Sequence, residues 1–541
     1  MRRVTRKFNR FLTEEEMEEL VVWQRFNCRK KGGKEGVANV VLDSNKDKFA
    51  VLNDRSTHTF CVAETGAGKT YSVLLPYLVT CISNHQSIIV NDCKQELLPC
   101  VLPYLEMNGY NTVILNMHCL SRSPDTYNPL QIPFELYKRG DIATAKKITR
   151  NLADFMFKAI DSEKDPYFTM AAKSIFNGAV SILMREAKVV EDCTLFNVAR
   201  LVVDIQRKIP VHNPLQEDYG IFGFDKESVS SLYFDEVSEK SELYCFDSLL
   251  NNSEETSRCV YSVFMACIEQ YITDTDIRNF LCRSSFNMEE FGKRPTACFV
   301  LSSDYETAYD SLVTTFFEQV YAINTLMADN SSKRRLNVPL HFVLDEFANL
   351  TTPFASMEKK ISTARSRGIR FFLVVQSIAG LRQSYKESTT QAILSNSGLW
   401  VVLRSTEHEV QKMVIERLGM TTYPSGKEEP LVTYADLSSM KIGEVLFIYQ
   451  GKPVFRRVLD FKEMDLPYKP MESYKFTKRK GEKHTSTGWN IIDYCYNILR
   501  KRTGLTLEQL KGEQPVLTEE MYTKKKRLQE LKIELDLEGD E

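Results

Sequence analysis

The chain has 541 residues, enough for about two to four domains and a substantial buried core. Its 70 basic and 72 acidic residues give a formal net charge of −2, so the overall charge neither favours nor excludes a nucleic-acid partner. No apolar run reaches the roughly 18 residues that a membrane-spanning helix requires, and the basic first ten residues lack the apolar core of a signal peptide. The composition therefore argues against an integral membrane protein and against a secreted one.

The cysteines point to a reducing compartment, and two basic clusters have a separate interpretation. The 13 cysteines stand singly and their number is odd, so we expect mostly buried thiols, such as Cys61 and Cys298 in apolar strands. The seven histidines do not fall at metal-ligand spacing from them. Residues 1–10 and 475–483 are basic, and each is either a solvated segment or a contact for nucleic acid or an anionic membrane.

The first region, residues 1–35, is predicted to be a basic, amphipathic extension with a helix. Thr13 suits the N-cap, and the acidic residues 14–16 suit the positive end of the helix dipole. Apolar residues then follow at helical spacing: Leu20, Val21, Trp23 and Phe26. We expect this stripe to dock on the body of the protein or on a partner.

The next region begins with a phosphate-binding loop. The segment Ala63-Glu-Thr-Gly-Ala-Gly-Lys-Thr70 follows the strand-like run 58–62 and precedes an apolar helical stretch. Ala63 stands where the common pattern has a glycine, whereas the closing G-K-[ST] is complete. The alternative is a glycine-rich turn without a ligand, but the flanking strand and helix favour a phosphate site.

Each residue type in this loop suits a nucleotide. We assign nucleotide contacts to six consecutive residues: Thr65, Gly66, Ala67, Gly68, Lys69 and Thr70. The glycines let the backbone aim N–H groups at phosphate oxygens, and the following helix adds the positive end of its dipole. Lys69 would reach the β- and γ-phosphates, and the Thr70 hydroxyl would hold Mg²⁺. The loop therefore predicts a nucleoside triphosphate, such as ATP, and Mg²⁺ as ligands.

Strand and helix patterns define the fold class. Short β-branched runs at 87–92 and 111–116 alternate with helices, which is typical of a parallel sheet covered on both faces. Between them and later strands, apolar residues repeat at helical spacing. We predict an α/β fold with a phosphate-binding loop, a mostly parallel sheet and an inserted all-α domain. The predicted regions are the extension 1–35, the first part of the nucleotide-binding domain 36–135, the inserted all-α domain 136–290, the second part of the nucleotide-binding domain 291–465, and a charged C-terminal extension 466–541.

Paired carboxylates end one strand of the second part. The apolar run 340–344 leads directly into Asp345 and Glu346. Asp345 is placed to hold the water shell of Mg²⁺, and Glu346 to polarise the attacking water. The alternative is an ordinary strand end with two solvated acids.

A further apolar strand ends at Gln376, which would sense the γ-phosphate in a RecA-like ATPase; otherwise it is only a polar strand end. Arg365, Arg367 and Arg370 lie between the acidic pair and Gln376. One of them could be the arginine that a neighbouring subunit supplies to stabilise transition-state charge, an effect worth about 10³–10⁵ in rate. They could equally be surface arginines at a helix end, and the residues alone do not decide.

Taken in order, these motifs resemble those of the coupling proteins of conjugative type IV secretion systems, of the TraG/TraD kind, within the RecA-like motors that include FtsK. The matching segments are Ala63-Glu-Thr-Gly-Ala-Gly-Lys-Thr70, Asp92-Cys-Lys-Gln-Glu96, Tyr127-Asn-Pro-Leu130, Asp165-Pro-Tyr-Phe168, Leu344-Asp-Glu-Phe-Ala-Asn-Leu350, Ala364-Arg-Ser-Arg-Gly-Ile369 and Val375-Gln-Ser377. Cys93 and Gln95 depart from the family's D-P-K-G-E. The resemblance covers about 60–420 and says little about either end.

The resemblance implies an ATP-driven homo-hexamer at the cytosolic face of a secretion channel. Such proteins recruit a relaxase joined to single-stranded DNA and pass it to the membrane components of the channel. By position, Arg365 matches the arginine that the family presents in trans. Members usually carry N-terminal transmembrane helices, whereas only about 35 residues precede the ATPase region here. We therefore expect a cytoplasmic variant that reaches the inner face of the membrane through a partner, the alternative being a lost anchor.

Two other functions remain open from the sequence. An FtsK-like or packaging-type translocase would move double-stranded DNA without a secretion partner. A nucleoprotein receptor or scaffold would use ATP for assembly and hydrolyse little of it. Preference for duplex DNA would favour the first, and nucleotide-dependent assembly with negligible turnover would favour the second.

Overall fold

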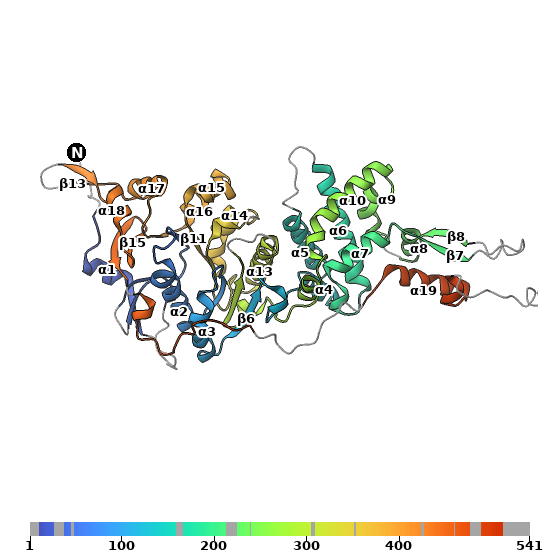
Figure 1. Ribbon diagram of the computed structural model, residues 1–541, viewed down its shortest axis with the longest axis horizontal. Helices are drawn as coiled ribbons and strands as arrows, with labels where there is room; N and C mark the ends of the chain where they lie inside the picture. Colours follow the sequence, from blue (N-terminus) through green and yellow to red (C-terminus); the bar gives the residue numbers. More distant parts are fainter. Residues whose placement is uncertain are drawn as a thin grey trace, which may run out of the picture. The chain divides into compact units, whose positions relative to one another are not determined.

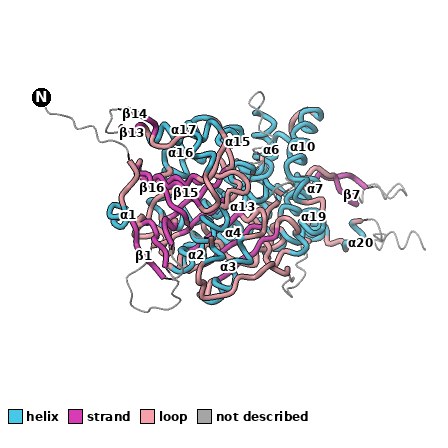
Figure 2. Tube along the Cα trace, turned by 60° about the vertical axis from the view of Figure 1, so that its left-hand side comes forward, coloured by secondary structure: helices cyan, strands magenta, loops and turns pink. Residues whose placement is uncertain are grey.

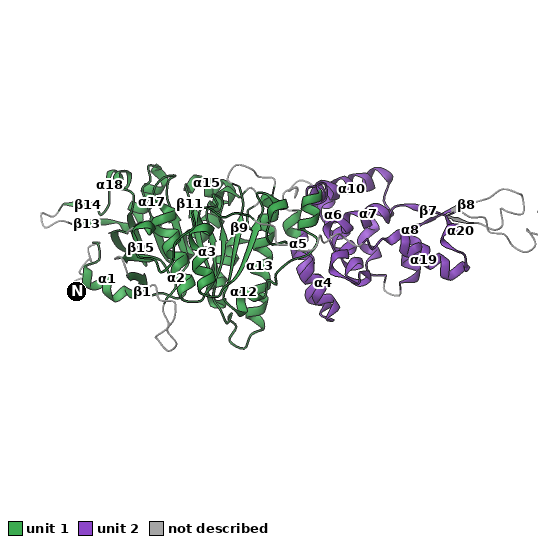
Figure 3. Cartoon of the chain, turned by 60° about the horizontal axis from the view of Figure 1, so that its bottom comes forward, with its two compact units in different colours: residues 1–129, 154–159, 275–484 green, residues 130–153, 160–274, 485–541 purple. Residues whose placement is uncertain are grey.

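The computed structural model describes residues 10–25, 37–44, 48–157, 166–212, 224–237, 240–303, 309–350, 353–422, 427–458, 460–476 and 488–511 (Figure 1). The chain forms two compact units (Figure 3). Unit 1 comprises residues 1–129, 154–159 and 275–484, and unit 2 comprises residues 130–153, 160–274 and 485–541.

Unit 1 is built on a nine-stranded sheet in the order β16-β15-β12-β4-β11-β10-β5-β9-β6. From β12 to β6 every neighbouring pair is parallel, and β15 and β16 add an antiparallel edge. The strands are β4 (Thr59–Val62), β5 (Ser87–Asn91), β6 (Asn111–Asn116), β9 (Thr296–Leu301), β10 (Leu340–Leu344), β11 (Ile369–Val375), β12 (Leu399–Val402), β15 (Glu444–Tyr449) and β16 (Lys452–Arg457). This architecture confirms the predicted α/β fold with a mostly parallel sheet.

The central strands are mostly apolar because both faces of the sheet are covered. Every residue of β4, β5, β10, β11 and β12 is buried. Helices α2 and α3 lie on one side of the sheet, and α15 and α16 lie on the other (Figures 1 and 2). The helices of unit 1 are α1 (Glu14–Leu20), α2 (Leu75–Ser83), α3 (Leu97–Met107), α11 (Thr275–Phe280), α12 (Glu290–Lys293), α13 (Asp310–Asn330), α14 (Met357–Thr363), α15 (Ile378–Ser384), α16 (Glu387–Asn396), α17 (His408–Leu418) and α18 (Tyr434–Ser439). A short pair, β13 (Met420–Thr422) and β14 (Glu428–Pro430), follows α17.

The N-terminal region is shorter in helix than predicted. Thr13 caps α1 as expected, because its hydroxyl accepts from the Glu16 N–H while the Glu16 carboxylate accepts from the Thr13 N–H. The predicted helical stripe is wrong beyond residue 20: Val21–Arg25 forms strand β1, which pairs with β3 (Lys48–Leu52) in a small sheet with β2 (Val41–Ser44). β-Branched and aromatic residues favour a strand here. Phe26 lies outside the described residues.

Unit 2 is mostly helical. Its helices are α4 (Gln131–Lys138), the start of α5 (Ile142–Met156), α6 (Pro166–Glu186), α7 (Leu195–Asp204), α8 (Val229–Glu236), α9 (Asp247–Leu250), α10 (Glu254–Ile268), α19 (Ile491–Thr503) and α20 (Leu507–Leu510). Long α6 forms its core with twelve buried residues and packs against α7 and α10. Two features were not predicted. An antiparallel pair, β7 (Lys208–His212) and β8 (Phe224–Ser228), belongs to this unit, and α19 from the C-terminal extension packs on α8.

Within the part of the chain that the structure describes, no helix has both the length and the apolar character needed to cross a membrane.

Candidate nucleotide-binding site

The sequence-predicted site residues meet at one edge of the unit 1 sheet. Strands β4, β11 and β10 are consecutive and parallel, so the segments that follow them emerge side by side. The phosphate loop follows β4, Gln376 follows β11, and the acidic pair follows β10. The carboxyl edge of an open α/β sheet is the usual place for a ligand.

The glycines of the phosphate loop hold conformations that other residues adopt only at a cost. Gly66 has φ +78° and Gly68 has φ +88°, both in the left-handed region. A Cβ at Gly68 would also lie 3.0 Å from Cγ2 of Ile442. Ala63 has no positive φ, and its N–H continues the ladder by donating to the Val375 carbonyl at 3.1 Å. Alanine therefore serves at this position, where the common pattern has glycine.

The loop presents unused donors for an anion. The N–H groups of Gly66, Gly68, Lys69 and Thr70 have no acceptor in the described part of the chain. Thr70 then opens a π-helical turn, η1 (Thr70–Leu74), that runs into α2. N–H groups directed outward at the start of a helix are the standard means of binding phosphate. The cradle and its donors fit a nucleotide.

Lys69 lies between the two acids of the predicted site. Its Nζ is 2.9 Å from Oδ1 of Asp345 and 2.5 Å from Oε1 of Glu346, and all three side chains are at most 6% exposed. Burial lowers the pKa of the Lys69 ammonium, but the two carboxylates outweigh burial and leave that pKa above its ordinary value. The lysine is therefore a charged partner for Asp345 and Glu346.

Glu346 occupies a strained turn that directs its carboxylate inward. Its φ and ψ are 54° and 40°, a left-handed conformation that a residue with a Cβ seldom adopts. Oε2 of Glu346 accepts from Nε2 of Gln376 at 2.7 Å and from Nδ2 of Asn349 at 3.2 Å. Oε1 of Gln376 in turn accepts from the Thr65 hydroxyl at 3.3 Å. Gln376 thus joins the phosphate loop to the acidic pair, and Asn349 is a contact that the sequence analysis did not single out.

The three candidate arginines have different surroundings. Arg367 forms a two-pronged ion pair with Asp329, and Arg370 is buried and donates to the Ala38 carbonyl. Arg365 is exposed, in the 3₁₀ turn before β11. β11 has seven residues, and its length places Arg365 about 20 Å from the edge where Gln376 lies. Arg365 therefore cannot reach Lys69 of its own chain.

Asp92 of the D-C-K-Q-E segment caps the start of helix α3. Its carboxylate accepts from the N–H groups of residues 96, 97 and 98 at 3.1, 3.1 and 2.9 Å, which satisfies the start of α3. Burial raises the pKa of this carboxyl to about 6, against the effect of those hydrogen bonds. Asp92 thus orients α3, and the structure gives it no contact with Lys69.

A polar cluster beside the phosphate loop was not predicted from the sequence. Glu64 accepts hydrogen bonds from the N–H and hydroxyl of Thr406, and its Oε2 lies 3.9 Å from Nε of Arg404. Glu407 accepts from the N–H groups of residues 378 and 379 at 3.2 Å, at the start of α15. In the sequence, only the position of Arg404 after an apolar strand, β12, could have indicated this cluster. Its proximity to the loop depends on the pairing of β12 with β4.

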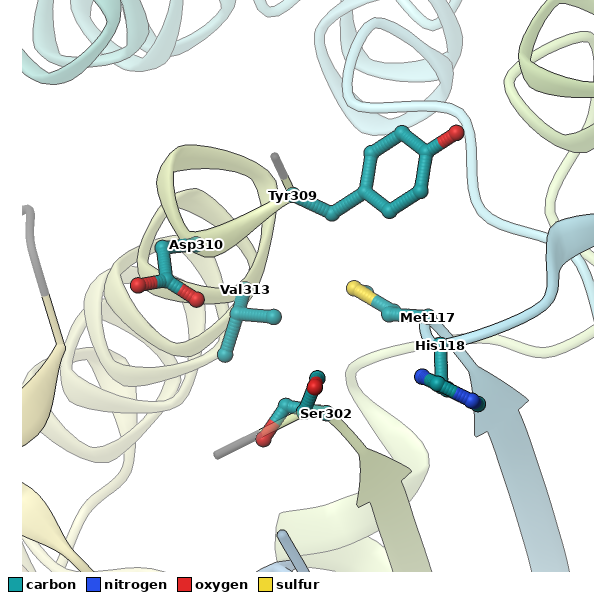
Figure 4. Close-up of a pocket in the computed structure, with 7 residues that line it drawn as sticks. Met117, His118, Ser302, Tyr309, Asp310 and Val313 are labelled. Atoms are coloured by element: carbon teal, nitrogen blue, oxygen red, sulfur yellow. The ribbon is translucent and has the colours of Figure 1, made fainter. Parts of the chain in front are cut away.

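A separate cavity of about 10 Å³ lies at the carboxyl ends of β6 and β9 (Figure 4). It is lined by Met117, His118, Ser302, Ser303, Tyr309, Asp310 and Val313. This volume admits about one water molecule. The cavity is therefore too small to bind a nucleotide.

Known proteins resemble this chain in sequence. Residues 14–431 match the family model described as type IV secretory system conjugative DNA transfer. Protein VirD4 of Rhizobium rhizogenes is 22% identical over 418 residues, which cover 76% of this chain and 56% of that protein. Protein VirD4 of Agrobacterium fabrum is 22% identical over 375 residues, covering 69% and 51%. The chain thus spans about half the length of the curated relatives it matches.

Solved structures show the same fold. The bacterial conjugative coupling protein TrwBdeltaN70 superposes with a TM-score of 0.56 at 12% identity, over 87% of this chain and 97% of that one. The plasmid coupling protein TrwB in complex with ADP and Mg²⁺ gives a TM-score of 0.55 at 13% identity, over 88% and 96%. The match to the family model extends from α1 to β14 and includes the phosphate loop and the acidic pair. The chain therefore belongs to the type IV secretory system conjugative DNA-transfer family.

Proposed function

We propose that this protein is an ATP-hydrolysing coupling protein, which recruits relaxase-bound single-stranded DNA and delivers it to a conjugative type IV secretion channel. One observation carries the proposal. Lys69 of the phosphate loop, both acids after β10 and Gln376 after β11 form a single hydrogen-bonded group. Family membership supplies the biological context, and the TrwB complex with ADP and Mg²⁺ supports nucleotide binding by this fold.

The residues present suit ATP and Mg²⁺. The loop N–H groups and Lys69 would hold the β- and γ-phosphates, and the Thr70 hydroxyl and Asp345 would hold the metal ion. When bound, Mg²⁺ neutralises charge on the phosphates. Glu346 would orient and polarise the attacking water, because its carboxylate is fixed by Gln376 and Asn349. Gln376 would report the state of the γ-phosphate to α15, which it precedes.

The position of Arg365 supports an oligomer. An exposed arginine at the far edge of the sheet can act on phosphate only in a neighbouring subunit, so we propose a homo-hexamer in which Arg365 completes the adjacent site. Membrane components of the channel would hold the ring at the inner face of the membrane. Relaxase and single-stranded DNA are the proposed cargo.

The test is ATP hydrolysis by the purified chain with and without single-stranded DNA. We expect DNA to stimulate hydrolysis, and Lys69→Ala and Glu346→Gln to abolish it. Lys412→Ala and Glu416→Gln are matched controls, since this exposed pair lies on α17. Activity indifferent to the first two changes would refute the proposed roles. Preference for duplex DNA would instead favour a double-stranded DNA translocase, and nucleotide-dependent assembly without turnover would favour a scaffold.

A further inference from the structure

We propose that Asn91 is a positioning residue that sets the turn carrying Asp345 and Glu346. The inference rests on the proposed ATPase function but concerns a residue outside the predicted site. Asn91 is the last residue of β5, and it pairs in register with Leu344 of β10. Its side chain therefore stands beside the point where the acidic pair begins.

The contact is direct and buried. Nδ2 of Asn91 donates to the backbone carbonyl of Asp345 at 3.0 Å, and Asn91 is completely buried. That carbonyl belongs to the peptide group that joins Asp345 to Glu346. The N–H of the same peptide group donates to Oδ1 of Asp345 at 3.1 Å. Both polar ends of the peptide plane are thus held.

Holding this peptide plane determines the conformation of Glu346. Rotation of the plane would change φ of Glu346, which is +54°, a value that is unfavourable for a residue with a Cβ. Without its anchor the turn would relax toward negative φ, and the carboxylate would leave Lys69 and Gln376. Asn91 offsets the strain that keeps Glu346 directed inward.

The amide of Asn91 is itself oriented by two neighbours. The Ser302 hydroxyl donates to Oδ1 of Asn91 at 2.9 Å, so the NH₂ group faces Asp345. Cys93 lies 3.1 Å from Nδ2 of Asn91 and 3.7 Å from the Asp345 carbonyl. Burial raises the pKa of the Cys93 thiol to about 12, so it remains a neutral S–H at physiological pH. Neither neighbour introduces a charge that would compete with the acidic pair.

Ser302 also borders the small cavity at the ends of β6 and β9 (Figure 4). Ser302 therefore both donates to Asn91 and lines this cavity. Replacement of Ser302 by alanine removes the hydroxyl without forcing a larger side chain into the core. This makes Ser302→Ala a mild second probe of the same cluster.

The experiment compares Asn91→Ala with a matched asparagine. Asn116 ends β6 at the same edge of the sheet, is 2% exposed, and accepts from the Cys119 N–H at 2.9 Å without touching the acidic pair. We expect Asn91→Ala to lower kcat of ATP hydrolysis by about 10- to 100-fold, because a displacement of about 1 Å in a catalytic group has an effect of this size. KM for ATP and the Kd for ADP with Mg²⁺ should change by less than about twofold, because the phosphate loop is untouched and Asp345 keeps its place directly after β10 and its ion pair with Lys69.

Ser302→Ala should lower kcat in the same direction by about threefold, and it keeps the test open if Asn91→Ala fails to fold. Asn116→Ala should leave kcat within about twofold of the wild type. Equal losses in kcat and affinity, or an equal effect of Asn116→Ala, would overturn the inference. A crystal structure of Asn91→Ala provides a readout independent of turnover: Glu346 should lose its positive φ and its contact with Gln376. Retention of both would also overturn it, whereas an inactive wild type with this structural change would contradict only the ATPase proposal.

Discussion

The Lys69 ammonium lies 2.5 Å from Oε1 of Glu346, although the two residues are 277 positions apart in the chain. The same nitrogen also contacts Asp345, so one cation pairs with two buried carboxylates. Lys69 is therefore a structural element as well as a candidate phosphate ligand. Binding of a triphosphate would require it to exchange these carboxylates for phosphate oxygens.

The first prediction concerns this ion group in the nucleotide-free protein. Lys69→Met should lower the free energy of unfolding of unit 1 by about 3–5 kcal/mol, because it leaves buried charges without a partner. The same change should cost less in a Glu346→Gln background, where one of those charges is absent. Urea unfolding of the wild type, both single variants and the double variant measures the coupling.

The exposed pair Lys412 and Glu416 provides the control cycle. Its nitrogen and oxygen lie 3.9 Å apart on α17, and such pairs couple by about 0.3–0.5 kcal/mol. If the coupling free energy between Lys69 and Glu346 is no larger than this, the ion pair does not stabilise the folded state as proposed.

The second prediction concerns Gln376, which links Thr65 to Glu346. Gln376→Leu keeps the volume but removes the donor to the Glu346 carboxylate. We expect kcat of ATP hydrolysis to fall by about 10²-fold with little change in KM, because the lost hydrogen bond orients the Glu346 carboxylate, while the phosphate loop and Lys69 still hold the phosphates. Gln391→Leu is the control, since Gln391 also donates to a glutamate but lies exposed on α16. A rise in KM with unchanged kcat would assign Gln376 to ground-state binding instead.

The third prediction tests the trans position of Arg365. Arg365→Ala and Lys69→Ala should each remove hydrolysis, the former by about 10³-fold or more. Mixing the two inactive proteins should restore about a quarter of the wild-type rate, because that share of sites pairs an intact Lys69 with an intact neighbouring Arg365. Arg367→Ala, which breaks the ion pair with Asp329, should leave the rate nearly unchanged. A mixture that stays inactive would place the arginine function elsewhere.

The main residues of the site could be predicted from the sequence because the carboxyl ends of parallel strands lie at the same edge of a sheet. Polar residues after separate apolar strands had to meet at one edge, and the structure brings Lys69, Asp345, Glu346 and Gln376 together there. The order of strands was not readable in the same way. Arg404 follows β12, which pairs with β4 more than 300 residues earlier, and no local pattern shows that pairing.

Short apolar runs were a second reason why the structure differs from the sequence-based prediction. Residues 21–25 carry a pattern that fits either a helix or a strand over so few positions, and pairing with β3 decides in favour of the strand. The contact of Asn91 with the Asp345 carbonyl also lay beyond local reasoning, since it depends on the register between β5 and β10. Tertiary pairing, rather than propensity, determined each of these features.

The last prediction concerns the pH dependence of stability. His58 is fully buried: its Nδ1 accepts from the Phe371 N–H at 3.0 Å, so its Nε2 donates to the Ile361 carbonyl at 2.9 Å. Burial, reinforced by the positive charges of Arg365 and Arg370, lowers the pKa of His58 to about 3. The unfolded chain binds a proton below about pH 6.5 that the folded chain does not, so folding stability falls as pH decreases from 6.5 toward 3. This histidine contributes a slope of about 1.4 kcal/mol per pH unit in that window.

His58→Gln can keep both hydrogen bonds but has no proton to gain. Its unfolding free energy should therefore change less steeply with pH between 4 and 6, by about 1.4 kcal/mol per unit relative to the wild type. Urea unfolding followed by the fluorescence of Trp400, which is 2% exposed in unit 1, measures the difference. His408→Gln is the control, because His408 lies exposed on α17 and should leave the slope unchanged. Equal slopes for the wild type and His58→Gln would mean that His58 is protonated in the folded chain, and the hydrogen bond from Phe371 to its Nδ1 would then have to be absent.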